Sequence, residues 1–190
     1  MSSTTETSQL LPMVLERLDL GERFRVLDAG PATPQTVEFF ADYKCHLHFA
    51  DLYDEAVLLE QDTLEPEDLE AHLEQTLSLR GDPFDLCLLW DAPNYLNANA
   101  LRAFGNALRP FVHRRTLAHG FGAFKETQPF TTQRYSITGA DQLLLQPATH
   151  PVGPNYPVTQ NALVAALPFF TVVRGTLMAD GRVELFLEAV

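Results

Sequence analysis

A strand, turn, helix and second strand near the amino terminus constrain the fold of this chain more than any other feature. Residues 25–55 read RVLDAGPATPQTVEFFADYKCHLHFADLYDE. One apolar run ends at Asp28, a turn begins at Gly30, and a second apolar run ends at Asp51. Two strands joined by a helix cross over to become parallel neighbours. The pattern therefore predicts an α/β fold built on a parallel sheet.

The alternation of helical and extended patterns continues along the chain. Leucines at helical spacing indicate helices, and short apolar runs bounded by turn residues indicate strands. Helices are expected over residues 9–20, 34–43, 54–74, 97–108 and 159–167. Strands are expected over 23–30, 45–52, 84–90, 115–124, 133–137 and 142–147, and on both sides of the turn Ala179-Asp180-Gly181. The predicted sheet is mostly parallel, ends in an antiparallel hairpin and carries helices on both faces.

The length and net charge of the chain indicate a single domain and disfavour a nucleic-acid-binding protein. The chain has 190 residues, of which 46% are hydrophobic, which suffices for one substantial core. We expect a flexible amino terminus over residues 1–8 and a single domain over 9–190. The formal net charge of −12 disfavours binding to a nucleic-acid backbone, which requires clustered cations. We therefore expect no nucleic-acid partner.

No segment predicts secretion or membrane insertion. The first ten residues, MSSTTETSQL, lack a basic start followed by an apolar core. Prolines interrupt the longest uncharged stretch, Gln142–Val173. We expect a cytoplasmic protein with no membrane contact. Its two cysteines, Cys45 and Cys87, are then expected to be free thiols, and they are too few for a thiolate metal cluster.

Polar groups follow three of the predicted strands, at the ends where parallel sheets bind ligands. Asp28 and Gly30 follow the first strand, Asp51 the second and Asp91 the third. Asp51 lies 21 residues after Gly30. This is close to the roughly 20 residues that separate a ligand-binding glycine turn from an acid that binds ribose hydroxyls. The spacing predicts a site for a nucleoside-containing ligand.

The order of these motifs resembles that of the class I S-adenosylmethionine-dependent methyltransferases. VLDAGPATP stands where that family has its first strand and glycine-rich turn, and HFADL where it has its ribose-binding acid. FDLCLLWDAPNYL is similar to its fourth-strand motif, and the closing hairpin to its antiparallel last strand. The resemblance covers residues 10–190 and implies a Rossmann-like methyltransferase fold with S-adenosylmethionine as cofactor.

The resemblance implies a role for each residue of the first motif. Gly30, with Pro31 and Ala32 in the same turn, would lie against the amino-acid part of the cofactor. Asp28 would order the turn or reach the cofactor ammonium through water.

Residues of the later motifs receive roles in the same way. Asp51 would accept both ribose hydroxyls, and Leu52 would pack on the adenine. Asp91 would line the floor beneath the sulfonium. Trp90 and Tyr95 would present aromatic faces to a cation.

Two glycine positions of the family's turn are replaced. Ala32 adds one methyl group near the ligand, whereas Pro34 removes an N–H group. At the first position of a helix that donor has no intrahelical partner, so Pro34 is tolerated there. The family usually has a helix, a strand and a second helix between the second and fourth strands. The stretch between Asp51 and Phe84 is short for these three elements. Asp62 is one candidate for an adenine-side acid, and this side of the site is expected to be reduced or open.

Two side chains are candidates for catalysis. His119 follows a predicted strand and is the best candidate for a general base, the alternative being a buried histidine bonded to the backbone. Tyr95 is the second catalytic candidate. His46 and His48 fall on one side of a strand but lack a third ligand, so no metal is expected.

The proline-rich segment Pro147–Pro157 precedes the last predicted helix. We expect a loop that covers the site, because acceptor sites in this family are built by variable covers. His150 and Tyr156 within it are further candidates for catalysis.

Two functions from different classes fit these residues. The first is an S-adenosylmethionine-dependent methyltransferase that acts on a small molecule or a protein side chain, and it rests on the acids and the glycine at the strand ends. The alternative is a catalytically inactive methyltransferase-like protein that acts as a binding or regulatory partner. It rests on the replaced glycines and the shortened middle segment.

Overall fold

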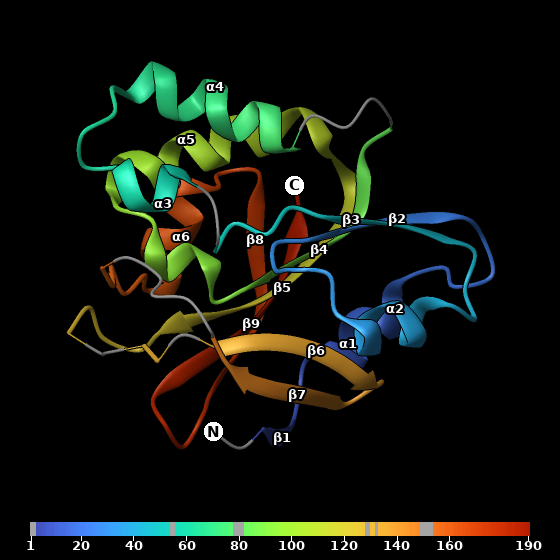
Figure 1. Cartoon of the computed structure of the whole chain (residues 1–190). Helices are drawn as coiled ribbons and strands as arrows, with labels where there is room; N and C mark the ends of the chain where they lie inside the picture. The colour runs from blue at the N-terminus through green and yellow to red at the C-terminus, as the bar shows by residue number, and fades with distance from the viewer. Residues whose placement is uncertain (1–2, 54–55, 78–81, 128–129, 132, 149–153) are drawn as a thin grey trace.

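A six-stranded sheet with the order β3-β2-β4-β5-β9-β8 forms the centre of the protein (Figure 1). The computed structural model describes residues 3–53, 56–77, 82–127, 130–131, 133–148 and 154–190. Four neighbouring strands are parallel: β3 (Cys45–Phe49), β2 (Phe24–Asp28), β4 (Phe84–Trp90) and β5 (Val112–Ala123). The two central strands β2 and β4 are buried almost throughout, as expected of strands covered on both faces.

The carboxyl-terminal hairpin completes this sheet. β9 (Arg182–Ala189) runs antiparallel to both β5 and β8 (Phe170–Leu177). Gly181 has φ of 86° in the turn, a conformation that glycine adopts without steric cost. The predicted mixed sheet with an antiparallel hairpin is confirmed.

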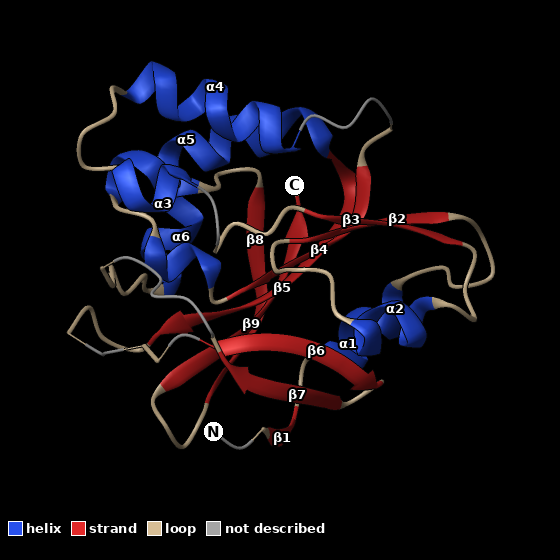
Figure 2. Cartoon of the chain, in the orientation of Figure 1, coloured by secondary structure: helices blue, strands red, loops and turns tan. Residues whose placement is uncertain are grey.

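Helices cover both faces of the sheet (Figure 2). One face carries α3 (Ala56–Glu60), α4 (Pro66–Leu77), α5 (Ala98–Leu108) and α6 (Gln160–Ala166). The other carries α1 (Leu11–Arg17) and α2 (Pro34–Phe40). Two 3-10 turns, η1 (Ala92–Tyr95) and η2 (Arg109–Phe111), follow β4 and α5. Within the described part of the chain, none of these helices combines the length and apolarity needed to span a bilayer.

A small second sheet lies over the face that carries α1 and α2. Its order is β1 (Thr4–Thr7), β7 (Gln142–Pro147) and β6 (Gln133–Gly139), all antiparallel. Apolar side chains of β6 and β7 pack into the same core as those of α1 and α2. The TTET segment of β1 has no apolar alternation, so no strand was predicted there, and pairing with β7 supplies the missing hydrogen bonds.

Element boundaries differ from the prediction where local turns end a helix. α1 and α2 are shorter than predicted, because 3-10-type hydrogen bonds close them: Leu18 N–H donates to the Leu15 carbonyl, and Ala41 N–H to the Glu38 carbonyl. The acidic segment predicted as one helix contains two, and the second begins at Pro66.

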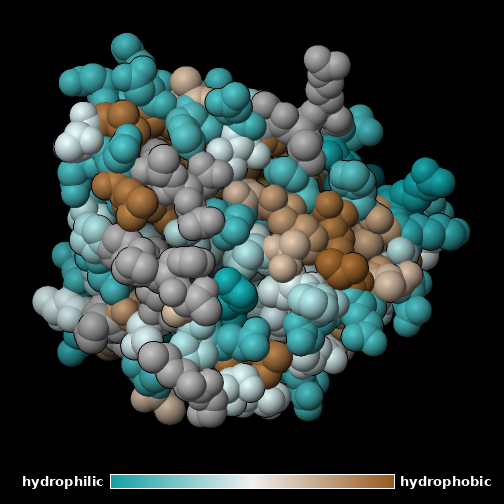
Figure 3. Space-filling model, in the orientation of Figure 1, coloured by the Kyte–Doolittle hydropathy of each residue, from teal (hydrophilic) through white to brown (hydrophobic). Residues whose placement is uncertain are grey.

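The acidic helix α4 has a solvated face, as its sequence predicts. Leu69, Leu73 and Leu77 are fully buried, whereas the acidic side chains of the helix are exposed except for the half-buried Glu70. Figure 3 shows a largely hydrophilic surface over α4, and apolar surface gathered between β3 and α2.

Candidate functional site

The ends of β2, β3 and β4 lie at one edge of the sheet because these strands are parallel. Main-chain hydrogen bonds join the loops that follow them. Asp51 N–H donates to the Gly30 carbonyl over 3.2 Å, and Leu52 N–H donates to the Ala29 carbonyl over 2.9 Å. The turn after Asp28 and the loop after β3 therefore form one continuous surface.

Two residues at this edge have a backbone conformation that side-chain-bearing residues rarely adopt. Among the described residues, the non-glycine residues with positive φ are Asp51, at 45°, and Trp90, at 49°. Such conformations cost on the order of 1–3 kcal/mol and cluster at functional sites. Both lie at the ends of strands that carry the predicted acids, which marks this edge as the candidate site.

Asp28 is buried against the turn that it precedes. Its Oδ1 accepts hydrogen bonds from Gly30 N–H over 2.8 Å and from the Trp90 indole N–H over 2.6 Å. Burial raises the pKa of Asp28 to about 7, although these two hydrogen bonds oppose the rise. The nearby charge of Asp51 raises it further. Asp28 therefore titrates near neutral pH.

The indole of Trp90 covers the glycine turn. A Cβ added at Gly30 would lie 3.4 Å from indole Cδ1. Behind the ring, the Trp90 carbonyl lies so close to β5 that a Cβ at Gly120 would approach it to 2.9 Å, so only glycine fits there. Trp90 is itself only 1% exposed. The face of Gly30 is thus occupied by the protein's own side chain.

Asp91 lies among tyrosine hydroxyls. The Tyr53 hydroxyl donates to Oδ1, and the Tyr135 hydroxyl donates to Oδ2 over 3.2 Å. The Tyr95 hydroxyl lies 3.5 Å from the same Oδ2. Burial raises the pKa of Asp91 to about 7, and the tyrosine hydrogen bonds together with the charge of Arg182 offset part of that rise.

Stacked aromatic rings extend the site towards the second sheet. The rings of Trp90 and Tyr135 stack with centroids 5.2 Å apart, and the Phe121 ring also stacks on Tyr135, at 5.2 Å. The Arg182 guanidinium lies 4.9 Å from the Phe121 ring centre. Because Tyr135 belongs to β6, the second sheet completes this side of the site.

The surface that a ligand can reach is formed by the loops. Ala32 is exposed, and Pro31 and Asp51 are half-buried, whereas Leu52 is buried in the core beneath them. Pro34 begins α2, and the Thr33 hydroxyl caps that helix by accepting from Thr36 N–H. Proline at position 34, where the methyltransferase family has a glycine, therefore removes no hydrogen bond from the helix.

His119 lies in the core behind Trp90. It is fully buried, and its Nε2 is 2.8 Å from Glu184 Oε1. The Ser8 hydroxyl and the N–H groups of Gln9 and Leu10 donate to the same carboxylate. The structure thus brings this catalytic candidate beside Trp90 and binds it to a buried acid. Tyr95, the other candidate, is buried beside Asp91.

The remaining candidates have other contacts. The Tyr156 hydroxyl donates to Asp62 Oδ2 over 3.0 Å, and Asn97 Nδ2 donates to Asp62 Oδ1 over 2.8 Å. Asp62 thereby joins the loop after α3, the start of α5 and the proline-rich segment. His150 lies outside the described residues.

The two histidines of β3 point to no metal site. His48 Nε2 lies 3.2 Å from the Thr76 carbonyl, and His46 is exposed. In the described ranges, no cluster of three or more metal-ligating side chains occurs. Cys45 and Cys87 are both free thiols.

Four residues that sequence reasoning missed hold the site together: Tyr53, Asn94, Tyr135 and Arg182. Asn94 Nδ2 donates to the Phe121 carbonyl over 2.8 Å, and its Oδ1 accepts from the main chain before α6. A polar residue inside the apolar motif WDAPNYL was a signal for such a role, since buried amides need partners. The sequence around Tyr135 and Arg182 contains no such signal, because only the fold brings these residues of β6 and β9 close to Asp91.

Comparison with solved structures identifies the fold. An aminopentose methyltransferase with bound S-adenosylmethionine, CalS10 from Micromonospora echinaspora, matches with a TM-score of 0.55 and 16% identity, over 95% of this chain and 89% of that chain. A methyltransferase from Clostridium acetobutylicum matches with a TM-score of 0.54 and 12% identity, over 95% and 89% of the two chains.

A third match is the 1,6-didemethyltoxoflavin-N1-methyltransferase of Burkholderia thailandensis, with bound 1,6-didemethyltoxoflavin and S-adenosylhomocysteine. Its TM-score is 0.53 at 15% identity, over 96% of this chain and 77% of that chain. No family model and no curated protein sequence matches the chain. The chain therefore has the class I methyltransferase fold that its motifs predicted.

Proposed function

We propose that this protein binds S-adenosylmethionine at the edge formed by β2, β3 and β4 and transfers its methyl group to a small-molecule or protein acceptor. The observation that carries the proposal is the strained, half-buried Asp51 beside the Gly30 turn. Solved methyltransferases of the same fold hold S-adenosylmethionine or S-adenosylhomocysteine. Their acceptors differ, so the acceptor of this chain stays open.

The residues at this edge fit the cofactor in two places. The Asp51 carboxylate would accept two ribose hydroxyls, a charge-assisted contact that fixes the orientation of the bound nucleoside. Asp28 titrates near neutral pH, so it can order the Gly30 turn in either protonation state. When bound, S-adenosylmethionine would supply an electrophilic methyl group on a sulfonium.

The other residues at this edge would orient the methyl acceptor and exclude water. Tyr53 and Tyr135 fix the Asp91 carboxylate at the end of β4, next to Trp90. The aromatic stack of Trp90, Tyr135 and Phe121 forms a wall from which water is excluded. Methyl transfer depends mainly on alignment of donor and acceptor, so these positioning contacts are the expected source of catalysis.

Trp90 must move for the cofactor to lie along Gly30. Its indole now covers that glycine and bonds to Asp28. Because the chain has one tryptophan, intrinsic fluorescence reports this residue alone. Titration with S-adenosylhomocysteine should change the emission of Trp90 in parallel with the heat measured by calorimetry.

Asp51→Ala should weaken the binding of S-adenosylhomocysteine by about ten- to a hundredfold, because it removes hydrogen bonds to a charged group. Asp42→Ala is the matched control, since Asp42 is an exposed acid in the turn after α2. Calorimetry of the three folded proteins measures the effect. Absence of heat for the wild-type protein at millimolar ligand would rule out the proposed function.

The second candidate is a protein that keeps the fold without the cofactor and acts as a binding or regulatory partner. The packing of Trp90 on Gly30 and of tyrosines on Asp91 favours it, because the site is filled by the protein itself. In that case pull-down from the source cell should recover one stoichiometric partner. Asp51→Ala should leave that association intact.

A further inference from the structure

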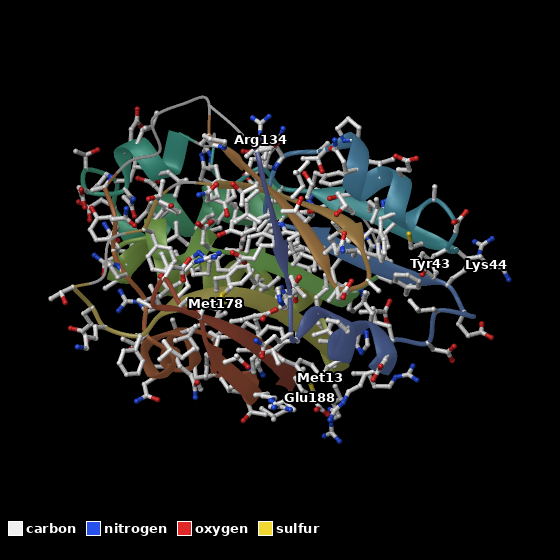
Figure 4. The ribbon with its side chains drawn as sticks, turned by 90° about the horizontal axis from the view of Figure 1, so that it is seen from below. Met13, Tyr43, Lys44, Arg134, Met178 and Glu188 are labelled. Atoms are coloured by element: carbon white, nitrogen blue, oxygen red, sulfur yellow. The ribbon has the colours of Figure 1, made fainter. Side chains whose placement is uncertain are left out.

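A groove opens at the opposite edge of the main sheet, where the parallel strands begin. Its volume is about 780 Å³, within the roughly 300–1,000 Å³ typical of small-molecule pockets. Its lining includes the cations Arg23, Arg25 and Lys44, the acids Asp82 and Asp85, and the rings of Tyr43 and His113. Figure 4 shows Tyr43 and Lys44 together at one end of the molecule. The five residues of β2 rise about 13 Å, so a small ligand here does not touch the Asp51 edge.

The charge of this groove is opposite to that of the whole chain. The formal net charge of the chain is −12, yet the groove is lined by three of its thirteen Arg and Lys side chains against two acids, Asp82 and Asp85. Within the described residues, Arg23, Arg25 and Lys44 form no ion pair with an acid. Three cations without an acidic partner create a local positive potential that attracts anions.

One of the two acids that line the groove, Asp85, is already used by the protein. Asp85 Oδ2 accepts from the main-chain N–H of Arg25 over 2.8 Å, and Asp85 Oδ1 lies 3.0 Å from His113 Nε2. His113 Nδ1 accepts from Arg115 N–H over 3.1 Å, so the His113 proton lies on Nε2 and points to Asp85. Asp85 therefore braces β2 against β5 and leaves the Arg25 guanidinium without a counterion.

Arg25 has an unused donor inside the protein. Its Nη1 is buried and has no hydrogen-bond partner, although its guanidinium lies 5.1 Å from the Phe84 ring centre. A buried guanidinium nitrogen without an acceptor is costly, and an anion in the groove would satisfy it. Tyr43 also lines the groove; it is half-buried, and its ring packs edge-on against Phe24.

We propose that this groove is a binding site for a small phosphate monoester that carries an aromatic ring. Arg23, Arg25 and Lys44 bind the phosphate, and Tyr43 packs against the ring. The volume of the groove exceeds that of a phosphate alone, which is why the ligand has a second, apolar part. This site is independent of the proposed methyl transfer, because it uses the beginnings of the strands and not their ends.

The test is NMR titration of the wild-type protein with phenyl phosphate. Separate titrations with inorganic phosphate and with phenol, the two halves of that ligand, are the controls. Phenyl phosphate lacks a nucleoside, so it does not report on the Asp51 edge. Phenyl phosphate should shift the amide signals of Tyr43, Lys44 and His113 and bind about tenfold more tightly than either half. Equal affinity for inorganic phosphate would overturn the role of the ring, and no binding at millimolar concentration would overturn the site.

A charge-reversal pair tests the cations. The double variant Arg23→Glu/Lys44→Glu changes two exposed side chains, so the fold should be kept, and it should lose phenyl phosphate affinity by at least tenfold. Arg102→Glu/Lys125→Glu changes the net charge equally, away from the groove, and should bind as the wild type does. Equal losses in both variants would show a general charge effect and contradict the site. The groove variants should leave the binding of S-adenosylhomocysteine unchanged from that of the wild type. If the wild type does not bind this ligand, the proposed function fails, but the test of the groove is unaffected.

Discussion

Replacement of Glu184 by alanine is expected to lower the free energy of unfolding by about 3–5 kcal/mol. Glu184 is 1% exposed, and its carboxylate accepts from His119, the Ser8 hydroxyl and the N–H groups of two residues before α1. Without the carboxylate, four donors lose their acceptor, and three of these hydrogen bonds are fully buried. Because these contacts attach the amino-terminal segment to β9, the loss should also release β1 from the small sheet.

Chemical denaturation of the variant and the wild type at pH 7 measures this effect. Glu188→Ala is the matched control on the same strand. Its ion pair with Arg17 is exposed, so its loss should cost no more than about 1 kcal/mol. If Glu184→Ala proved no more destabilising than Glu188→Ala, the buried network would not anchor the amino terminus.

Acid should weaken the same network. Burial alone would raise the pKa of Glu184, but the hydrogen bonds and charge of His119, with those of Ser8 and Gln9, lower it to about 2 from 4.5. A depressed pKa stabilises the folded state above the unfolded value. The contribution of Glu184 is therefore complete above pH 4.5 and lost as pH falls towards 2. In the Glu184→Gln variant, the free energy of unfolding should therefore depend less on pH between 4.5 and 2 than in the wild type.

Asp28→Asn is expected to stabilise the folded protein at pH 8 by on the order of 2–4 kcal/mol. Burial raises the pKa of Asp28 to about 7 from 3.8, so the folded state binds the proton more tightly than the unfolded chain does. The resulting stability is complete below pH 4 and is lost as pH rises through 7. An asparagine stays neutral, and its side-chain oxygen can still accept from Gly30 and Trp90.

Denaturation of wild type and variant between pH 4 and pH 8 tests this prediction. The two proteins should have similar stability at pH 4 and diverge towards pH 8. Asp42→Asn, at an exposed position, should show no divergence. A variant that is no more stable than the wild type at pH 8 would contradict a costly charge at Asp28. The predicted gain fits a functional site, where stability is given up for a poised carboxyl group.

The strand-turn-helix-strand unit of residues 24–51 could be predicted because its signals are local. Apolar runs, the turn at Gly30 and the proline at the start of α2 each act within a few residues. The closing hairpin was predictable for the same reason, since its turn is marked by Asp180 and Gly181. The strand β1 was not, because its stability comes from pairing with β7.

The candidate site was predicted only in part. Asp28, Gly30, Asp51 and Asp91 end parallel strands, so their common edge follows from the order of the strands. Nothing local revealed that the Trp90 indole lies on Gly30, because this depends on the positive φ of Trp90 and on the absence of a side chain at Gly120. The sequence also could not place Tyr135, which reaches Asp91 from the second sheet.

The sequence by itself determined the type of sheet, the order of its motifs and the edge at which the acids meet, because these depend on hydrophobic period, turn residues and strand direction. The tertiary structure alone decided how that edge is filled. Burial, and not the type of residue, raises the pKa of Asp28 and Asp91 to about 7. Likewise, Arg23 and Arg25 at the beginning of β2 and Lys44 just before β3 come from two segments of the chain, and only folding gathers them around one groove.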